Sequence, residues 1–336
     1  MSPGDKILIK PNLLSPVEVT HAVTTHPTVI EALVKCLKDL GVGKIVIGDS
    51  PAVSNALKVA RKCGIEEISK KFGIDIVNFD TPVKVKGKFG RIFEVAREIL
   101  EADKIINLAK FKTHTHMIMT LSIKNMFGSV VGLRKSAWHA KTGTNKMKFA
   151  DMLVELYETI KPTLNIIDGI WGMEGNGPRN GKPKRLGVLL VGEDGHAVDF
   201  VACKMVKLEK IVPTLLAAEK RRLLNIKNVD IIGDGFRIID NFIPPDTSIK
   251  GITGIINPFG RFFVKFPKVV LNKCVGCKIC KEHCPVGAID MREDDKARIN
   301  IDKCIRCYVC QEVCPENAIE LIRKGHTRGD KTVTSL

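Results

Sequence analysis

Residues 274–285 read CVGCKICKEHCP and residues 304–315 read CIRCYVCQEVCP, so one pattern of four cysteines and a proline occurs twice. Three cysteines at this spacing let one tight turn present three thiolates to a single cluster, while the fourth ligates the other cluster. The spacing therefore predicts two [4Fe–4S] clusters with crossed ligands. The predicted ligands are Cys274, Cys277, Cys280 and Cys314 for one cluster, and Cys304, Cys307, Cys310 and Cys284 for its partner.

A pair of zinc knuckles is the alternative interpretation of these cysteines. Zinc sites usually use two CxxC pairs, or cysteine with histidine, so a triplet followed by Cys-Pro favours iron and sulfur. The repeat also continues past the ligands, because PVGAI at 285–289 recurs as PENAI at 315–319. Over residues 272–322 the chain resembles two-cluster ferredoxins. The resemblance implies one-electron transfer between neighbouring clusters, with a purely structural role for the clusters as the other possibility.

The length of 336 residues leaves room for a larger body ahead of this module. Pro244-Pro245 indicates a linker, and the aromatic, basic stretch that follows is expected to pack the module against the body or to contact a membrane surface or nucleic acid. The expected division is an α/β body domain over 1–240, a linker or docking segment over 241–271, a ferredoxin domain over 272–322 and a disordered tail over 323–336.

The net charge of +16 is carried by the body, where Lys and Arg outnumber Asp and Glu by 41 to 27 over residues 1–271. A basic body is compatible with nucleic acid, a membrane surface, an anionic substrate or an acidic redox partner, or with solubility alone. Two Tyr, two Trp and no RNA-binding signature argue against nucleic acid. There is no 18-residue apolar run and no signal-peptide pattern, and the many thiolates favour a reducing, cytoplasmic location.

Short apolar runs alternate with helical patterns over residues 1–270, which predicts an open, mostly parallel sheet with flanking helices. The predicted strands cover residues 7–9, 44–47, 74–77, 104–108, 163–167, 186–191 and 229–232. The predicted helices cover residues 26–40, 54–63, 66–72, 148–160, 197–206 and 212–224.

Polar side chains follow four of these strands. They are Lys10 and Asn12, Asp49 and Ser50, Lys112 and His114, and Asp168. Because ligands bind beyond the carboxyl ends of strands in open parallel sheets, we expect a substrate or cofactor site there.

Two further segments are expected to close over this site. Lys124-Asn125 lies next to an apolar turn, and the glycine-rich stretch 171–182 contains Glu174. Successive N–H groups in such a stretch can form an anion nest, although a solvated loop fits it as well. The dinucleotide fingerprint and the P-loop motif are both absent from the sequence.

The histidines offer two interpretations. If the backbone is extended, His114 and His116 share a face and bind a metal, with His139 as a third ligand; otherwise they are hydrogen-bonded structural groups. His114 also suits general acid–base chemistry, and Lys112 and Lys124 suit stabilisation of a developing anion. The predicted catalytic residues are Lys112, His114, Lys124 and Asp168. The predicted ligand-binding residues are Lys10, Asn12, Asp49, Ser50, Asn125 and Glu174, holding an additional metal or an anionic ligand.

Taken as a set, motifs of the body resemble the family called domain of unknown function 362 over about residues 5–235. The matching stretches are KPN at 10–12, TTHP at 24–27, GDS at 48–50, KFKTH at 110–114, KNMFG at 124–128, DG at 168–169, EGNGP at 174–178 and VD at 198–199. The resemblance implies a body fused to a two-cluster ferredoxin module. It implies no particular reaction.

Two functions follow as hypotheses. In the first, the chain is an iron–sulfur oxidoreductase, or an accessory subunit of one, that passes single electrons between the clusters and a ligand at the strand ends. Since no flavin or nicotinamide fingerprint occurs, the other redox group is the substrate, an unseen cofactor or a partner protein. In the second, the chain is a non-catalytic electron-transfer adaptor whose basic body docks an acidic protein partner.

Overall fold

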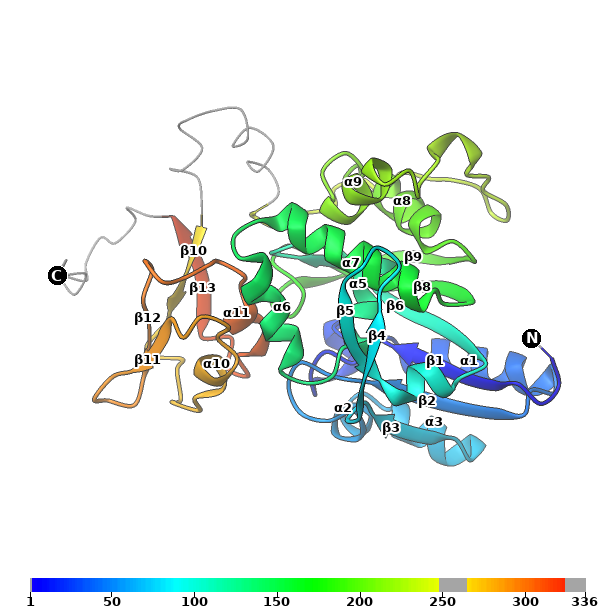
Figure 1. Ribbon diagram of the computed structural model, residues 1–336, viewed down its shortest axis with the longest axis horizontal. Helices are drawn as coiled ribbons and strands as arrows, with labels where there is room; N and C mark the ends of the chain where they lie inside the picture. Colours follow the sequence, from blue (N-terminus) through cyan, green and yellow to red (C-terminus); the bar gives the residue numbers. More distant parts are fainter. Residues whose placement is uncertain (1, 248–264, 324–336) are drawn as a thin grey trace. The chain divides into compact units, whose positions relative to one another are not determined.

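The computed structural model describes residues 2–247 and 265–323, which form two compact units, residues 1–246 and residues 247–336 (Figure 1). Most of the segment expected to be a linker, and all of the expected tail except Arg323, lie outside the described residues. Each unit is described by itself.

The body is built on a seven-stranded sheet in the order β3-β2-β1-β6-β8-β9, with β7 paired to β6. Strands β3, β2, β1, β6 and β8 run parallel to one another, while β7 and β9 run antiparallel to their neighbours. The strands are β1 (Lys6–Pro11), β2 (Lys44–Asp49), β3 (Asp75–Asn78), β6 (Lys104–His114), β7 (Ile118–Thr120), β8 (Leu164–Glu174) and β9 (Lys182–Gly192). This confirms the predicted open, mostly parallel sheet.

Helices cover both faces of the sheet, and Figure 1 shows α2 and α3 on the opposite side from α7, α8 and α9. Alternate residues of β1 face different cores, since Ile7 and Ile9 pack with the α1 side and Leu8 packs with the α7 side. The main helices are α1 (Pro27–Asp39), α2 (Ala56–Lys62), α3 (Ile65–Phe72), α7 (Lys146–Ile160), α8 (Gly195–Met205) and α9 (Pro213–Lys220).

Local sequence explains where several helices begin. Pro27 occupies the first turn of α1, and the His26 ring accepts a hydrogen bond from the backbone N–H of Thr28. The side chains of Asn55 and Asn145 cap α2 and α7 in the same manner. These caps supply acceptors for N–H groups that lack partners within the helix.

Some elements differ from the prediction. Residues 229–232 form no strand, and Ile232 is 94 % exposed, so this apolar run is not part of the sheet. Trp171 to Glu174 belong to β8, which leaves only residues 175–181 as the glycine-rich loop. The unpredicted elements of the body are β4 (Pro82–Lys86), β5 (Ile92–Ala96), β7, α4 (Arg97–Glu101), α5 (Ser122–Asn125), α6 (Arg134–Thr142) and the short 3-10 turns Val19–His21, Met126–Ser129 and Ile226–Asn228.

The C-terminal unit is an α+β module with an internal repeat. Strand β10 (Lys265–Val269) pairs antiparallel with β13 (Ile319–Arg323), and β11 (Ile289–Met291) pairs antiparallel with β12 (Ala297–Ile299). The helices α10 (Ile279–Glu282) and α11 (Val309–Val313) each contain the third cysteine of a triplet, Cys280 and Cys310.

The repeat is also visible in the backbone. Gly276 and Lys278 have φ of 72° and 63°, and Arg306 and Tyr308 have φ of 57° and 61°. Left-handed residues therefore recur at equivalent places in both cluster loops. Strand β10, which packs into this repeat, lies within the segment expected to be a linker.

Candidate functional site

The four cysteines predicted for the first cluster lie around one pocket of the C-terminal unit. They are Cys274, Cys277, Cys280 and Cys314, and apolar side chains including Val269, Ala297 and Ile319 complete the lining. The structure thus brings the first cysteine triplet together with the last cysteine of the second run.

The second set shows the same proximity. Burial, together with the neighbouring thiols of Cys304 and Cys284, raises the pKa of Cys307 to about 12. In the first set, burial and then Cys314 raise the pKa of Cys280 to about 11. Thiols in this environment keep their protons unless a metal supplies positive charge, which is what an iron–sulfur cluster does when bound.

Backbone N–H groups point at four of the sulfurs. Ala288 N lies 3.2 Å from the Sγ of Cys284, and Ala318 N lies 3.3 Å from the Sγ of Cys314. Two more donors lie within 3.5 Å of the Sγ atoms of Cys274 and Cys304. Such donors stabilise ligand thiolates and tune cluster potentials, so the residues present fit [4Fe–4S] clusters.

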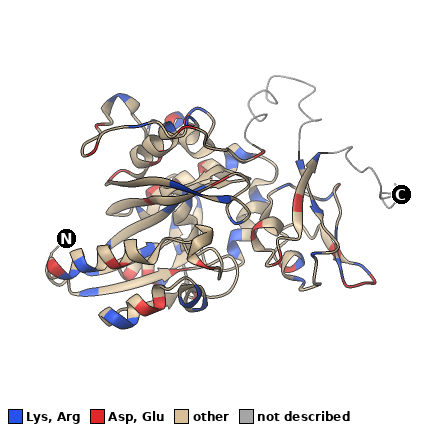
Figure 2. Ribbon diagram, turned by 180° about the vertical axis from the view of Figure 1, so that it is seen from behind, with Lys and Arg blue, Asp and Glu red and all other residues tan. Residues whose placement is uncertain are grey.

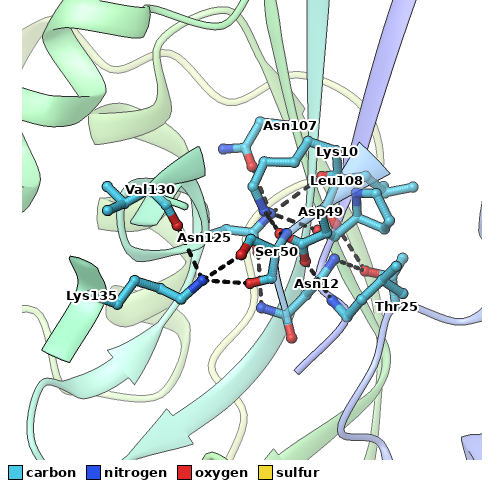
Figure 3. A network of polar contacts seen from close by, with 12 residues as sticks. Lys10, Asn12, Thr25, Asp49, Ser50, Asn107, Leu108, Asn125, Val130 and Lys135 are labelled. Atoms are coloured by element: carbon cyan, nitrogen blue, oxygen red, sulfur yellow. Dashed lines mark hydrogen bonds and ion pairs between the residues drawn. The ribbon is translucent and has the colours of Figure 1, made fainter. Parts of the chain in front are cut away.

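In the body, the predicted strand-end residues form a buried polar network (Figure 3). Lys10 Nζ lies 2.8 Å from Asp49 Oδ1, with side-chain exposures of 0 % and 5 %. The Asp49 carboxylate also accepts hydrogen bonds from the backbone N–H groups of Ser50 and Leu13. Burial lowers the pKa of Lys10, although the Asp49 charge opposes the shift.

A chain of amides continues from this pair across the sheet. Lys112 Nζ donates to Asn12 Oδ1 at 2.8 Å, and Asn12 Nδ2 donates to Asn125 Oδ1 at 2.8 Å. Asn125 in turn donates to Asn107 Oδ1 at 2.8 Å, and Asn107 donates to Asn165 Oδ1 at 2.9 Å. Side-chain hydrogen bonds therefore join Asn12, which follows β1, to α5, β6 and β8 at the predicted site.

Asp168 belongs to a second buried pair. Lys110 Nζ lies 2.8 Å from Asp168 Oδ2, and the backbone N–H of His26 donates to the same oxygen at 2.9 Å. Burial lowers the pKa of Lys110 and of His26. Neither residue was among the predicted functional ones, although both lie in the motifs KFKTH and TTHP that carried the family resemblance.

The histidines do not share an extended backbone. His114 Nδ1 accepts hydrogen bonds from the N–H groups of His116 and Met117, at 3.0 Å and 3.3 Å, because the chain turns directly after β6. His116 instead packs edge-on against His139, and burial lowers its pKa well below the ordinary value. The geometric condition for a metal shared by His114 and His116 is therefore absent.

The remaining predicted residues lie in different surroundings. Lys124 Nζ is 5.2 Å from the ring centroid of Phe127, which is a cation–π distance. Glu174 accepts the Ile243 N–H at 2.9 Å and lies 3.0 Å from Lys184 Nζ. It therefore connects the end of β8 to Ile243 and to β9.

Two further residues of the site were not among the predicted functional ones. Asp199 accepts the N–H groups of Ser122 and Ile123 at 2.7 Å and 3.0 Å, and so caps α5. Burial raises the Asp199 pKa to about 7. Lys135 of α6 has its Nζ 2.7 Å from Ser50 Oγ, and no motif pointed to it.

These two units define a class of protein: an iron–sulfur electron-transfer protein with an α/β body and a ferredoxin module. The chain belongs to the family described as domain of unknown function (DUF362), which matches residues 7–204. The 4Fe-4S dicluster domain matches residues 273–318. Among the described residues, no helix is long and apolar enough to cross a membrane.

Two known proteins are similar to the chain. The thylakoid-associated protein of Synechocystis sp. is 32 % identical over 288 residues, which cover 82 % of this chain and 88 % of that protein. The lactate racemase apoprotein of Thermoanaerobacterium thermosaccharolyticum has a TM-score of 0.41 and 13 % identity, covering 62 % of this chain and 50 % of that chain.

Proposed function

We propose that the chain is an iron–sulfur oxidoreductase, or an accessory subunit of one. Two [4Fe–4S] clusters, held by the two crossed cysteine sets, pass single electrons to or from an anionic small molecule at the strand ends of the body. A partner protein serves as the electron donor or acceptor at the clusters.

The burial of three lysines at the strand ends carries this proposal. Lys10, Lys110 and Lys112 are each at most 1 % exposed, and Lys10 and Lys110 have lowered pKa values. Burying ammonium groups is costly even when they are paired, so a fold that collects them at one sheet edge gains little stability from them. Buried, shifted titratable groups at such an edge are typical of functional sites.

The proposed roles rest on the chemistry of the side chains. Lys112 and Lys124 stabilise negative charge that develops on the ligand, and His114 exchanges a proton with it. Asp168 orients Lys110 through their ion pair. The proposed binding residues are Lys10, Asn12, Asp49, Ser50, Asn125 and Glu174.

The test is to purify the full chain without oxygen and to identify any small anion or additional metal released on denaturation. We expect about eight irons per chain and one bound anion. Lys112→Met should lose the anion and keep the iron, whereas Lys148→Met, a change at an exposed lysine of α7, should keep both. The ligand site would be contradicted if the wild type released no anion and if its clusters exchanged electrons at the same rate as those of the Lys112→Met variant.

The second candidate is the non-catalytic adaptor. The contacts of Lys10 and Lys110 favour it, because ammonium groups that are already paired with protein carboxylates need no anionic ligand. Against it, Figure 2 shows blue and red residues interspersed along the ribbon of the body. The pairs Lys35–Glu31 and Arg61–Glu66 are examples. The adaptor predicts that association with an acidic partner weakens steeply with salt.

We propose the cytoplasm as the location. The name of the Synechocystis relative associates that protein with thylakoids, which makes peripheral attachment to a membrane the competing location. Fractionation of cells into soluble and membrane pools, with a salt wash of the membranes, separates the two.

A further inference from the structure

We propose that Ser50 and Lys135 form a nucleophile–base pair that accepts acyl groups from esters or thioesters. Ser50 directly follows β2, and Lys135 is the second residue of α6, 85 positions later in the chain. Their Oγ and Nζ atoms lie 2.7 Å apart (Figure 3). The pair works without the clusters and does not depend on the proposed electron-transfer function.

The contacts of Lys135 suit a neutral amine. Its Nζ lies 2.8 Å from the carbonyl oxygen of Ser50 and 3.1 Å from that of Val130, in addition to the Ser50 hydroxyl. A neutral amine has two N–H donors and one lone pair. In the structure Nζ donates to Ser50 Oγ as well as to the two carbonyl oxygens. When Nζ loses a proton, its two remaining donors keep the carbonyl oxygens, and its lone pair then accepts the Ser50 hydroxyl proton.

The surroundings support this protonation state. Burial lowers the pKa of Lys135 to about 7; Asp49 opposes the shift, and the charges of Lys10 and Lys124 add to it. A lysine that loses its proton near neutral pH is able to act as a general base, as in other serine nucleophiles activated by lysine. Asp49 is itself held by Lys10, which limits how far it restores the charge on Lys135.

The chain beside this buried pair is exposed to solvent. Ser50 is 8 % exposed, Gly132 beside it is exposed, and Leu133 is 60 % exposed. The N–H of Gly132 donates to Ser50 Oγ at 3.3 Å and helps to fix its position. In the proposed reaction, a small acyl donor approaches Ser50 from this exposed stretch.

The proposed reaction is a two-step transfer to water. Ser50 Oγ forms a bond to the acyl carbon while Lys135 Nζ takes the hydroxyl proton. The bond from that carbon to the alcohol or thiol then breaks, and the leaving group takes the proton from Lys135. Water attacks the acyl-serine with Lys135 again as base, which releases the carboxylic acid and restores Ser50. We assign esters and thioesters as the acyl donors, since the alcohol or thiol leaves readily from the acyl carbon.

The test uses full-length protein with its clusters and p-nitrophenyl acetate as the acyl donor. The readouts are the burst of p-nitrophenol and peptide mass spectrometry of the acetylated site. We expect acetylation at Ser50, with a rate that rises with pH around a midpoint near 7, where Lys135 loses its proton. Lys135→Arg keeps hydrogen-bond donors at this position but stays protonated and cannot act as a base, so the rate should fall about 100-fold or more.

Matched controls lie in the same helix. Ser136→Ala and Lys141→Met should leave the burst unchanged, and Ser50→Ala should abolish it. If Ser50 is acetylated no faster than Ser136, or if Lys135→Arg reacts at the wild-type rate, the pair is a structural tie between β2 and α6. The p-nitrophenol burst and the acetylated peptide report on Ser50 and Lys135, whereas iron content and cluster spectra report on the clusters. Failure of the acyl-transfer proposal is therefore distinguishable from failure of the electron-transfer proposal.

Discussion

Lys10 and Asp49 form a buried ion pair that joins the carboxyl ends of the neighbouring parallel strands β1 and β2. The same Asp49 carboxylate accepts two backbone N–H groups, and Lys10 Nζ lies 3.2 Å from the carbonyl oxygen of Pro11. Each charge thus depends on the other, and the pair fixes the backbone from which Ser50 and Asn12 extend.

Removing one member of this pair should destabilise the body strongly. Lys10→Met leaves the Asp49 carboxylate buried without its cation, which costs about 3–5 kcal/mol. The measurement is urea denaturation followed by the fluorescence of Trp138 and Trp171. Lys44→Met is the control, because Lys44 pairs with Asp75 between β2 and β3 with both side chains at least 60 % exposed.

The control should cost less than about 1 kcal/mol, as exposed pairs do. Adding Asp49→Leu to Lys10→Met should restore part of the loss, because the orphaned carboxylate is then gone. Equal losses for the Lys10 and Lys44 variants would show that the buried pair contributes no more than a surface one.

Gly128 should tolerate no side chain. A Cβ at this position would lie 2.2 Å from Asp49 Oδ1 and 2.7 Å from Lys10 Nζ. Gly128→Ala therefore has to separate the pair, and we expect destabilisation of about 1–3 kcal/mol, typical of overpacking, or more. Urea midpoints measure the loss. In the Lys10→Met/Asp49→Leu background the contact with both polar atoms is absent, so the cost of Gly128→Ala should change there; an identical cost would contradict the proposed clash.

The sequence was sufficient to predict the sheet edge and much of its polar network. Lys10, Asp49 and Lys112 each follow an apolar run at a strand end, and parallel strands bring such ends to one edge. Asp168 also follows such a run, but it pairs with Lys110 rather than with the other strand-end residues. That pairing depends on the order of the strands and on the face of the sheet that each side chain occupies. Neither can be read from one strand alone.

Other features left no periodic signal. Helix α5 has four residues, which is about one turn, so no helical period could reveal how Asn125 is held. The contact between Ser50 and Lys135 spans 85 positions and depends on where α6 packs. Residues 229–232 are apolar yet largely exposed, so their composition alone wrongly predicted a strand.

Asp199 should make the body less stable as pH rises from about 4 to about 7. Its folded-state pKa of about 7 lies above the unfolded value of about 4, so the folded state binds the extra proton in this window. The slope is at most about 1.4 kcal/mol per pH unit. Asp199→Asn removes the titrating group, so the stability of wild type relative to the variant should fall as pH rises. If the difference in unfolding free energy between wild type and Asp199→Asn stayed constant from pH 4 to pH 7, the Asp199 carboxyl would not be the titrating group.

The crossed arrangement of the cysteines can be tested by comparing single ligands. If Cys314 completes the first cluster, Cys314→Ser and Cys274→Ser should perturb the same electron paramagnetic resonance signal, and Cys284→Ser should perturb the other one together with Cys304→Ser. The iron content should fall from about eight toward about four per chain in each variant. Cys36→Ser, at an exposed cysteine of α1, should leave both signals intact. If Cys314→Ser instead affected the signal that depends on Cys304, each run would hold its own cluster, and the common pocket of Cys314 and Cys274 would not be a cluster site.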